Sequence, residues 1–270
     1  MKALEKLRNK NKEGKFICVG LDSDIDKIPS HLKKMADPIF EFNKSIIEST
    51  VNHAAAFKLN FAFYERNGYE GLLTLEKTIA LIPKDILIIA DAKRGDIGNT
   101  SAMYAKAVFD KLSFDSITVN PYLGEDSILP FLTDADKLVF ILALTSNPSA
   151  EDFEKLKLLN GKFLFQHVIE KVKSWNKNNN CGIVFGATKA KELEDNIQNF
   201  DSLPVLLPGV GAQGGSLEDV VSIFKKYKRN DYVINVSRGI IYKSSNADFY
   251  KSAEIEIKDL NNKVEKLLNY

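Results

Sequence analysis

The chain has 270 residues, 44% hydrophobic and 27% charged, which is typical of a globular protein and excludes disorder or a fibrous repeat. Its 37 Lys and Arg balance 36 Asp and Glu, so a net charge of +1 provides no bulk field to attract nucleic acid or an anionic membrane. Two cysteines, no secretory signal and no apolar run long enough to span a bilayer predict a cytoplasmic protein without a disulfide framework.

Short apolar runs alternate with amphipathic stretches along the whole chain, after a short N-terminal helical extension. We interpret the runs as strands, in chain order 16–22, 54–60, 86–93, 116–121, 137–145, 181–188, 204–211 and 232–239. The spacing of apolar residues predicts helices over 37–51, 67–82, 99–112, 163–176, 189–200, 216–227 and 249–268, with a short one after Leu123. Segment 149–162 has no clear partner in this pattern.

The alternation of strands and helices predicts an α/β fold with a parallel sheet. Several strands, such as ILIIA and LVFILAL, are apolar from end to end, as expected for strands covered on both faces. Eight such units in about 250 residues favour a closed (β/α)8 TIM barrel. An open doubly wound sheet usually has fewer strands and a G-x-G-x-x-G turn, whereas the first strand here ends in G-L-D-S-D. No linker divides the chain, so we expect one domain over residues 1–270.

Polar residues gather where the expected strands end, which in barrels of this kind is the face that carries the active site. Six of the eight strand ends contribute Asp22, Lys58, Asn60, Asp91, Lys93, Asp96, Thr145, Ser146, Asn147, Gly209, Gly211, Gln213, Ser237, Arg238 and Gly239. Residues two apart on a strand share a face, so Lys58 points with Asn60, and Asp91 with Lys93. One charged loop residue is usually only solvated, but this concentration indicates a site.

The segment D-A-K-R-G-D-I-G-N-T, residues 91–100, is the most informative stretch. A lysine buried in this run is tolerable only when paired, and Asp91 is the adjacent partner of Lys93. Neighbouring carboxylates favour the charged form of a lysine, so Lys93 is suited to deliver a proton rather than to attack as a Schiff-base nucleophile. The carboxylates of Asp91 and Asp96 would repel the carboxylate of a substrate placed beside them. The segment therefore predicts loss of a carboxylate and protonation of the carbanion by Lys93.

The loop P-G-V-G-A-Q-G-G-S, residues 208–216, opens a predicted helix and resembles a phosphate cradle of backbone N–H groups. Its glycines could instead merely form turns. Arg238 at the end of the eighth strand supplies a bidentate partner for phosphate, and barrels often bind phosphate after strands seven and eight. Together, the loop and Arg238 favour the phosphate site.

The sequence contains no pattern typical of a metal site. His31, His53 and His167 lie away from the strand ends, while Cys18 and Cys181 come early in their strands. No serine-hydrolase elbow is present either. We therefore expect no metal.

The motifs resemble those of the orotidine 5′-phosphate decarboxylase family. Its signature D-x-K-x-x-D followed by I-G-N-T matches Asp91, Lys93, Asp96 and Thr100. F-K-L-N, T-S-N-P-S and P-G-V-G-A-Q-G-G resemble the second, longer subgroup of the family, and the matches span all eight expected strands. D-x-K-x-x-D alone is shared with related sugar-phosphate enzymes.

The resemblance implies conversion of orotidine 5′-phosphate to uridine 5′-phosphate and CO2 in pyrimidine biosynthesis, without a cofactor. Lys93 would protonate C6 of the pyrimidine, in a charged array of Lys58, Asp91, Lys93 and Asp96. Asp22, Lys58 and Asn60 would hold the ribose hydroxyls or order the array. The pyrimidine would contact Ser146, and Gln213 with Arg238 would grip the phosphate.

The resemblance also implies a homodimer with shared active sites, in which Asp96 and Thr100 serve the neighbouring subunit. The chain departs from many members of the family at two positions. Ser23 stands where Pro is common, and Ser237 stands where Gly is common. Either change could shift the ribose or phosphate contacts, although neither removes a charge.

Two alternatives remain open. One is a magnesium-dependent relative that decarboxylates 3-keto-L-gulonate 6-phosphate or condenses formaldehyde with a pentulose phosphate. Such relatives carry an acidic ligand on the second strand, where this chain has Lys58 and Asn60. The other is a barrel that binds a phosphate ligand without catalysis.

Overall fold

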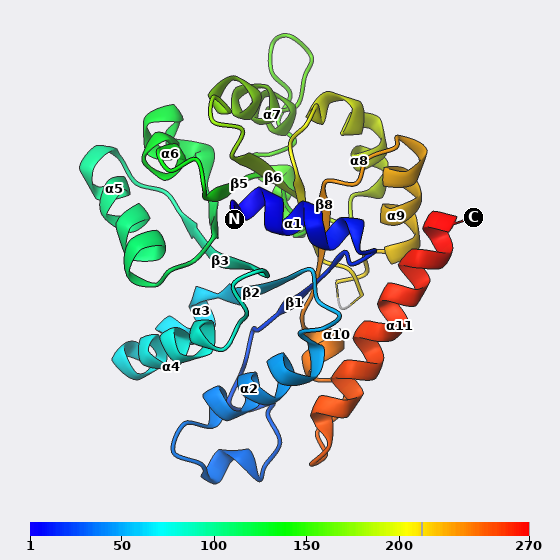
Figure 1. Ribbon diagram of the computed structural model, residues 1–270. Coiled ribbons are helices and arrows are strands. Elements are labelled where there is room, and N and C mark those ends of the chain that lie inside the picture. The colour runs from blue at the N-terminus through cyan, green and yellow to red at the C-terminus, as the bar shows by residue number, and fades with distance from the viewer. Residues whose placement is uncertain (212, 270) are drawn as a thin grey trace.

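In the computed structural model, which describes residues 1–211 and 213–269, eight parallel strands close into one barrel in sequential order (Figure 1). The strands are β1 (Ile17–Gly20), β2 (Ala56–Asn60), β3 (Leu87–Arg94), β4 (Ser116–Val119), β5 (Leu138–Leu144), β6 (Cys181–Phe185), β7 (Val205–Pro208) and β8 (Tyr232–Val236). Each strand pairs in parallel with its successor, and β8 pairs with β1. The predicted (β/α)8 barrel is confirmed.

Helices surround the barrel, as Figure 1 shows. The α-helices are α1 (Ala3–Lys12), α2 (Pro38–Thr50), α3 (Phe61–Glu65), α4 (Gly68–Ala80), α5 (Gly98–Lys106), α6 (Glu125–Leu132), α7 (Leu164–Trp175), α8 (Ala190–Asn196), α9 (Leu217–Lys226), α10 (Arg238–Ile241) and α11 (Phe249–Asn269). The shorter helical segments are η1 (Leu32–Lys34), η2 (Ala107–Lys111), η3 (Pro121–Leu123), η4 (Pro148–Asp152) and η5 (Ile197–Phe200). Within the described residues, no helix is long and apolar enough to cross a membrane.

Six of the eight strands end earlier than the apolar pattern predicts, whereas β2 and β3 do not. The eighth run was expected to continue to residue 239, but β8 ends at Val236 and Arg238 already begins α10. Val236 is paired with Val19 of β1, which itself ends one residue later at Gly20. Because the neighbouring strand has ended, the backbone of β8 has no further partner and turns into a helix. Arg238 therefore lies on the first residue of a helix at the mouth of the barrel.

The hydrophobic core has two layers. One lies between the strands and the outer helices, and the other fills the barrel with side chains such as Cys18, Phe140, Leu206 and Val233. The Phe140 ring packs over Gly182 of the next strand, where an added Cβ would come within 2.8 Å of the ring. The barrel interior is therefore solid, and open space is left to its ends.

Helix α1 covers the end of the barrel where the strands begin (Figure 1). Ala3 and Leu7 are buried against the interior side chains. Around them, Lys6 pairs with Asp115 at 2.6 Å, Arg8 with Asp231 at 2.9 Å and Lys10 with Asp85 at 2.7 Å, and each aspartate lies just before a strand. Helix α1 thus covers this end, and the cavity described below lies at the opposite end.

Candidate active site

A cavity of about 440 Å³ lies at the end of the barrel where the strands finish. Most of the side chains expected at a site line this cavity, namely Asp22, Lys58, Asn60, Asp91, Lys93, Ser146, Gln213 and Arg238. In the part of the chain that the structure describes, Asp96 and Thr100 are outside the cavity lining. The Asp96 carboxylate instead accepts a hydrogen bond from the backbone N–H of Ile97 at 2.8 Å. Residues of all eight strands, or of the loops that follow them, line the cavity, and two of the expected residues lie outside this lining.

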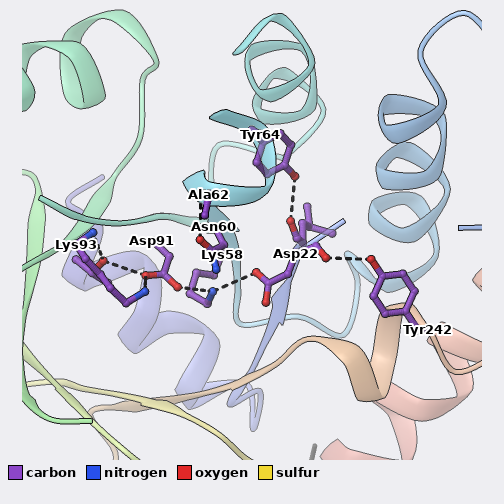
Figure 2. Close-up of polar contacts among 10 residues, drawn as sticks. Asp22, Lys58, Asn60, Ala62, Tyr64, Asp91, Lys93 and Tyr242 are labelled. Atoms are coloured by element: carbon purple, nitrogen blue, oxygen red, sulfur yellow. Dashed lines mark hydrogen bonds and ion pairs between the residues drawn. The ribbon is translucent and has the colours of Figure 1, made fainter. Parts of the chain in front are cut away.

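Four charged side chains form a row of alternating sign along one wall of the cavity (Figure 2). Lys93 Nζ lies 2.5 Å from Asp91 Oδ1, and Asp91 Oδ2 lies 2.8 Å from Lys58 Nζ. Lys58 Nζ also lies 3.4 Å from Asp22 Oδ1. Within the described part of one chain the charged array is therefore Lys93–Asp91–Lys58–Asp22, and Asp96, which the resemblance also places in the array, lies outside it.

The strand register brings these side chains together. Lys58 of β2 is paired with Gly20 of β1, and Asn60 of β2 is paired with Asp91 of β3. The ends of these three neighbouring strands therefore bring Asp22, Lys58 and Asp91 to the barrel mouth. The turn that carries Asp22 is held by two tyrosines (Figure 2). Tyr64 Oη donates to the carbonyl of Leu21 at 3.0 Å, and Tyr242 Oη donates to the carbonyl of Asp22 at 3.0 Å. These bonds immobilise the turn after β1.

The two inner groups of the array, Asp91 and Lys58, remain ionised over a wide pH range. Burial by itself would raise the pKa of Asp91, but the ammonium groups of Lys58 and Lys93 outweigh it and hold that pKa well below its usual range. Burial likewise would lower the pKa of Lys58, but the carboxylates of Asp22 and Asp91 raise it above the ordinary lysine value. The cavity wall therefore presents full charges to a ligand at neutral pH.

The buried lysine of the array is Lys58 and not Lys93. The Lys58 side chain is 4% exposed, whereas the Lys93 side chain is 51% exposed, so the expectation that Lys93 is buried was wrong. The pairing of β3 with β4 shifts register between Ala90 and Arg94, and Lys93 takes a left-handed φ of 46°. Such strained backbone often accompanies functional residues. The irregularity turns the Lys93 side chain from the barrel wall into the open cavity.

Thr118 of β4 holds this irregular backbone. Its hydroxyl accepts from the Lys93 backbone N–H at 3.0 Å and donates to Asp91 Oδ1 at 3.1 Å. Our sequence interpretation missed Thr118, and also Glu154 and Asn235, which line the cavity. A polar residue inside an otherwise apolar strand was the available signal for Asn235, whereas Thr118 shares its short strand with the polar Ser116. Glu154 comes from segment 149–162, where no pattern pointed to a site.

The loops after β5, β7 and β8 supply another part of the cavity lining. Ser146 Oγ donates to Gln213 Oε1 at 2.7 Å, and both side chains line the cavity with Arg238. Gly209 has a φ of 102°, and a Cβ there would lie 3.0 Å from Gln213 Oε1 and 3.2 Å from the Ser146 side chain. Glycine is thus required for the close approach of these two loops. Ala212 of the predicted phosphate loop lies outside the described residues.

The two departures from the family pattern have different surroundings. Ser23 is 2% exposed, and its hydroxyl donates to Asn43 Oδ1 at 2.5 Å. Asn43 in turn donates to Tyr64, which holds the turn after β1, so Ser23 supports the site from behind. Ser237 lines the cavity, and its Cβ would lie only 2.7 Å from a Cβ added to Gly20.

The three histidines and two cysteines lie apart from the cavity lining in the described chain. Among residues 1–211 and 213–269, no group of three or more His, Cys, Asp or Glu is placed to hold a metal ion. Burial raises the pKa of Cys18, and raises that of Cys181 to about 12, so both thiols stay protonated.

Comparison with known proteins points to one family. The family model for the orotidine 5′-phosphate decarboxylase / HUMPS family matches residues 15–252. The orotidine 5′-phosphate decarboxylase of Phocaeicola vulgatus is 46% identical over 266 residues, covering 96% of each chain. That of Flavobacterium johnsoniae is 49% identical over 247 residues, covering 89% of each chain.

Solved structures agree. The Leishmania donovani OMP decarboxylase superposes with a TM-score of 0.85 at 34% identity and covers 100% of both chains. The UMP synthase of the same organism superposes with a TM-score of 0.84 at 36% identity, and the chain spans 56% of that longer protein. The charged array, the closed barrel and these similarities agree, and the chain belongs to the orotidine 5′-phosphate decarboxylase / HUMPS family.

Proposed function

We propose that this chain converts orotidine 5′-phosphate to uridine 5′-phosphate and CO2, with Lys93 as the proton donor. The relatives named above are orotidine 5′-phosphate decarboxylases. The observation that carries the proposal is the row Lys93–Asp91–Lys58–Asp22, which places an ionised carboxylate beside a solvent-facing ammonium group. The proposed reaction uses both groups, the carboxylate beside the departing CO2 and the ammonium group as the proton donor.

The reaction has two parts that the array can serve. The bond between C6 and the carboxylate carbon breaks, CO2 leaves, and the electron pair remains on C6. The negative charge of Asp91 lies beside the departing carboxylate, so charge repulsion falls as CO2 forms. Lys93 Nζ then gives its proton to C6 and regains one from solvent. Because Lys58 is bonded to two carboxylates, it is better suited to order the array than to donate a proton.

Binding energy from the phosphate supports the difficult step. Enzymes lower barriers by about 8–23 kcal/mol, which is far more than one ion pair supplies. The side chains of Arg238 and Gln213 line the same cavity as the array, where they can hold the phosphate while the pyrimidine contacts Ser146. The binding energy of the phosphate can offset the cost of placing the pyrimidine ring beside the charged array.

We further propose a homodimer that completes each site. Asp96 and Thr100, which do not line the cavity of their own chain in its described part, would reach the site of the neighbouring subunit. Exposed apolar side chains surround them, since Ile97 is 58% exposed and Met103 47%. A cytoplasmic location belongs to the same proposal and is supported by the two unpaired thiols.

The magnesium-dependent alternative fits the cavity poorly. The ammonium group of Lys58 lies between the carboxylates of Asp22 and Asp91, within 3.4 and 2.8 Å, and so occupies the place that a divalent ion would need. A sugar-phosphate reaction through a metal at these carboxylates would require Lys58 to move away.

The test is the ultraviolet absorbance of orotidine 5′-phosphate after addition of the purified protein, with and without EDTA. We expect rapid loss of the substrate band at the same rate in both samples. Loss only without EDTA would favour the magnesium-dependent reaction. An unchanged band, together with tight binding of uridine 5′-phosphate, would indicate a barrel that binds without catalysis.

A further inference from the structure

Segment 149–162, which the sequence left without a partner, returns to the cavity through Glu154. Its carboxylate contacts the loop after β5, where Oε2 accepts from the backbone N–H of Thr145 at 2.7 Å. Oε1 accepts from the Thr145 hydroxyl at 2.8 Å, and that hydroxyl also lies 2.6 Å from Asn147 Oδ1. Glu154 thus binds both polar groups of the residue that precedes Ser146.

Ser146 is held from its other side as well. The Thr188 hydroxyl donates to the Ser146 carbonyl at 3.2 Å. Gly186 of the neighbouring loop packs so tightly that an added Cβ would lie 2.8 Å from the Ser146 backbone. The backbone of Ser146 is therefore confined between the loop after β6 and the Glu154 carboxylate. This confinement directs Ser146 Oγ toward Gln213.

Glu154 is itself firmly placed. Its carbonyl accepts from the backbone N–H of Phe165, in the first turn of α7, at 2.8 Å. The next residue, Lys155, pairs with Glu151 at 2.9 Å and with Glu192 of α8 at 2.6 Å. The segment is thus bonded to α7 and α8. These bonds fix the position of Glu154 at the cavity wall.

We propose that Glu154 is a positioning residue that holds Ser146 and Gln213 in place for the nucleotide. The inference rests on the proposed function, since it assigns ligand contacts to these two side chains. Glu154 lines the cavity, and both of its carboxylate oxygens accept hydrogen bonds from Thr145, so the carboxylate acts on the loop that carries Ser146. Bonds to an ionised acceptor are stronger than neutral ones, which suits a role in fixing backbone geometry.

The experiment compares Glu154→Ala with Glu154→Gln, using uridine 5′-phosphate as the probe in calorimetry and orotidine 5′-phosphate in kinetics. We expect Glu154→Ala to weaken the Kd of uridine 5′-phosphate and to lower kcat/KM by about tenfold, since bonds to a charged group are lost. Glutamine keeps an acceptor for the Thr145 N–H and should restore both values to within about threefold. A glutamine variant as weak as the alanine variant would overturn the proposal.

Glu151→Gln is the matched control, because Glu151 belongs to the same segment, is 60% exposed and carries the same charge. It should leave Kd and kcat/KM unchanged, and an effect equal to that of Glu154→Ala would reduce the role of Glu154 to the general stability of the segment. If Glu154→Ala does not fold, Thr145→Val replaces it, since it removes the hydroxyl bond and keeps the N–H. That variant should weaken binding less than tenfold but measurably, and wild-type affinity would contradict the proposal.

Ser146→Ala separates this inference from the proposed function. If Glu154 acts through Ser146, the double variant Glu154→Ala/Ser146→Ala should bind uridine 5′-phosphate no more weakly than Ser146→Ala does, within about threefold. Additive losses would overturn the positioning role and leave the ligand contact of Ser146 intact. Wild-type affinity in Ser146→Ala would instead contradict the ligand contact itself.

Discussion

The two ends of the barrel use the same kinds of side chain for different purposes. Where the strands begin, Lys6 and Lys10 of α1 each have one close aspartate partner, and Leu7 is buried beside them. Where the strands finish, Lys58 contacts two carboxylates and Asp91 contacts two ammonium groups. Separate ion pairs around the buried Leu7 cover the first end. A continuous row of charge along an open cavity makes the second end reactive.

Strand β8 runs between the two ends of the barrel, and an arginine side chain lies at each of its ends. Asp231, just before the strand, is bonded by Arg8 through two contacts of 2.9 and 3.1 Å. Arg238, just after the strand, lines the cavity. An arginine whose partner is within the protein stabilises the fold, whereas an arginine that faces a cavity is available to an anionic ligand. Variants at matched positions of the two ends can therefore test the division of roles.

The largest effect is expected from Lys93→Ala. Without the proton donor, kcat for orotidine 5′-phosphate should fall by about 10²–10⁴-fold. The Lys93 side chain is half exposed, so the variant should fold and should still bind uridine 5′-phosphate. Lys10→Ala at the closed end is the control and should leave kcat unchanged. Near-normal turnover in Lys93→Ala would refute the proton-donor role.

Lys58→Met should have the largest effect on stability. Methionine fills the space of the stem but leaves the carboxylates of Asp22 and Asp91 without their shared cation, which costs about 3–5 kcal/mol. Lys6→Met at the closed end should cost only about 1–3 kcal/mol, because Asp115 keeps its hydrogen bond from the Ile88 N–H. Denaturant unfolding of both variants measures the difference. Equal losses would mean that the two ends are not electrostatically distinct.

Arg238→Ala should weaken the binding of uridine 5′-phosphate by about 10- to 100-fold, since charge-assisted bonds to the phosphate are lost. Arg8→Ala removes the same type of side chain at the opposite end of β8 and should not change the Kd in calorimetry. The proposed phosphate site would be wrong if Arg238→Ala bound the nucleotide as tightly as the wild type.

The smallest effect concerns pH. The lowered pKa of Asp91 stabilises the fold above the ordinary aspartate value of about 3.9, and this stabilisation is lost as pH falls below it. The raised pKa of Lys58 stabilises the fold below about 10.4, and the contribution is lost as pH rises further. The difference in melting temperature between wild type and Lys58→Met should therefore be flat from about pH 5 to 9. A step within that range would show that the pair titrates there.

Local patterns in the sequence predicted the secondary structure well and predicted the site in part. Apolar runs bounded by polar ends located all eight strands, because a barrel strand is buried along its length and meets solvent only where it finishes. The same logic placed Asp22, Lys58, Asp91 and Arg238 at the mouth of the barrel. It failed for Glu154, which reaches the cavity from a segment without periodicity.

The amino-acid sequence by itself determined the order of the elements, the end of the barrel that carries the site, and the charged residues that gather there. What only the tertiary structure decided is how those charges pair. The strand register places Lys58 between two carboxylates. The register shift between β3 and β4 turns the Lys93 side chain into the open cavity. Pairing depends on distances of a few ångströms between strands that are far apart in the chain, and a periodic pattern records which face a residue occupies but not which neighbour it meets.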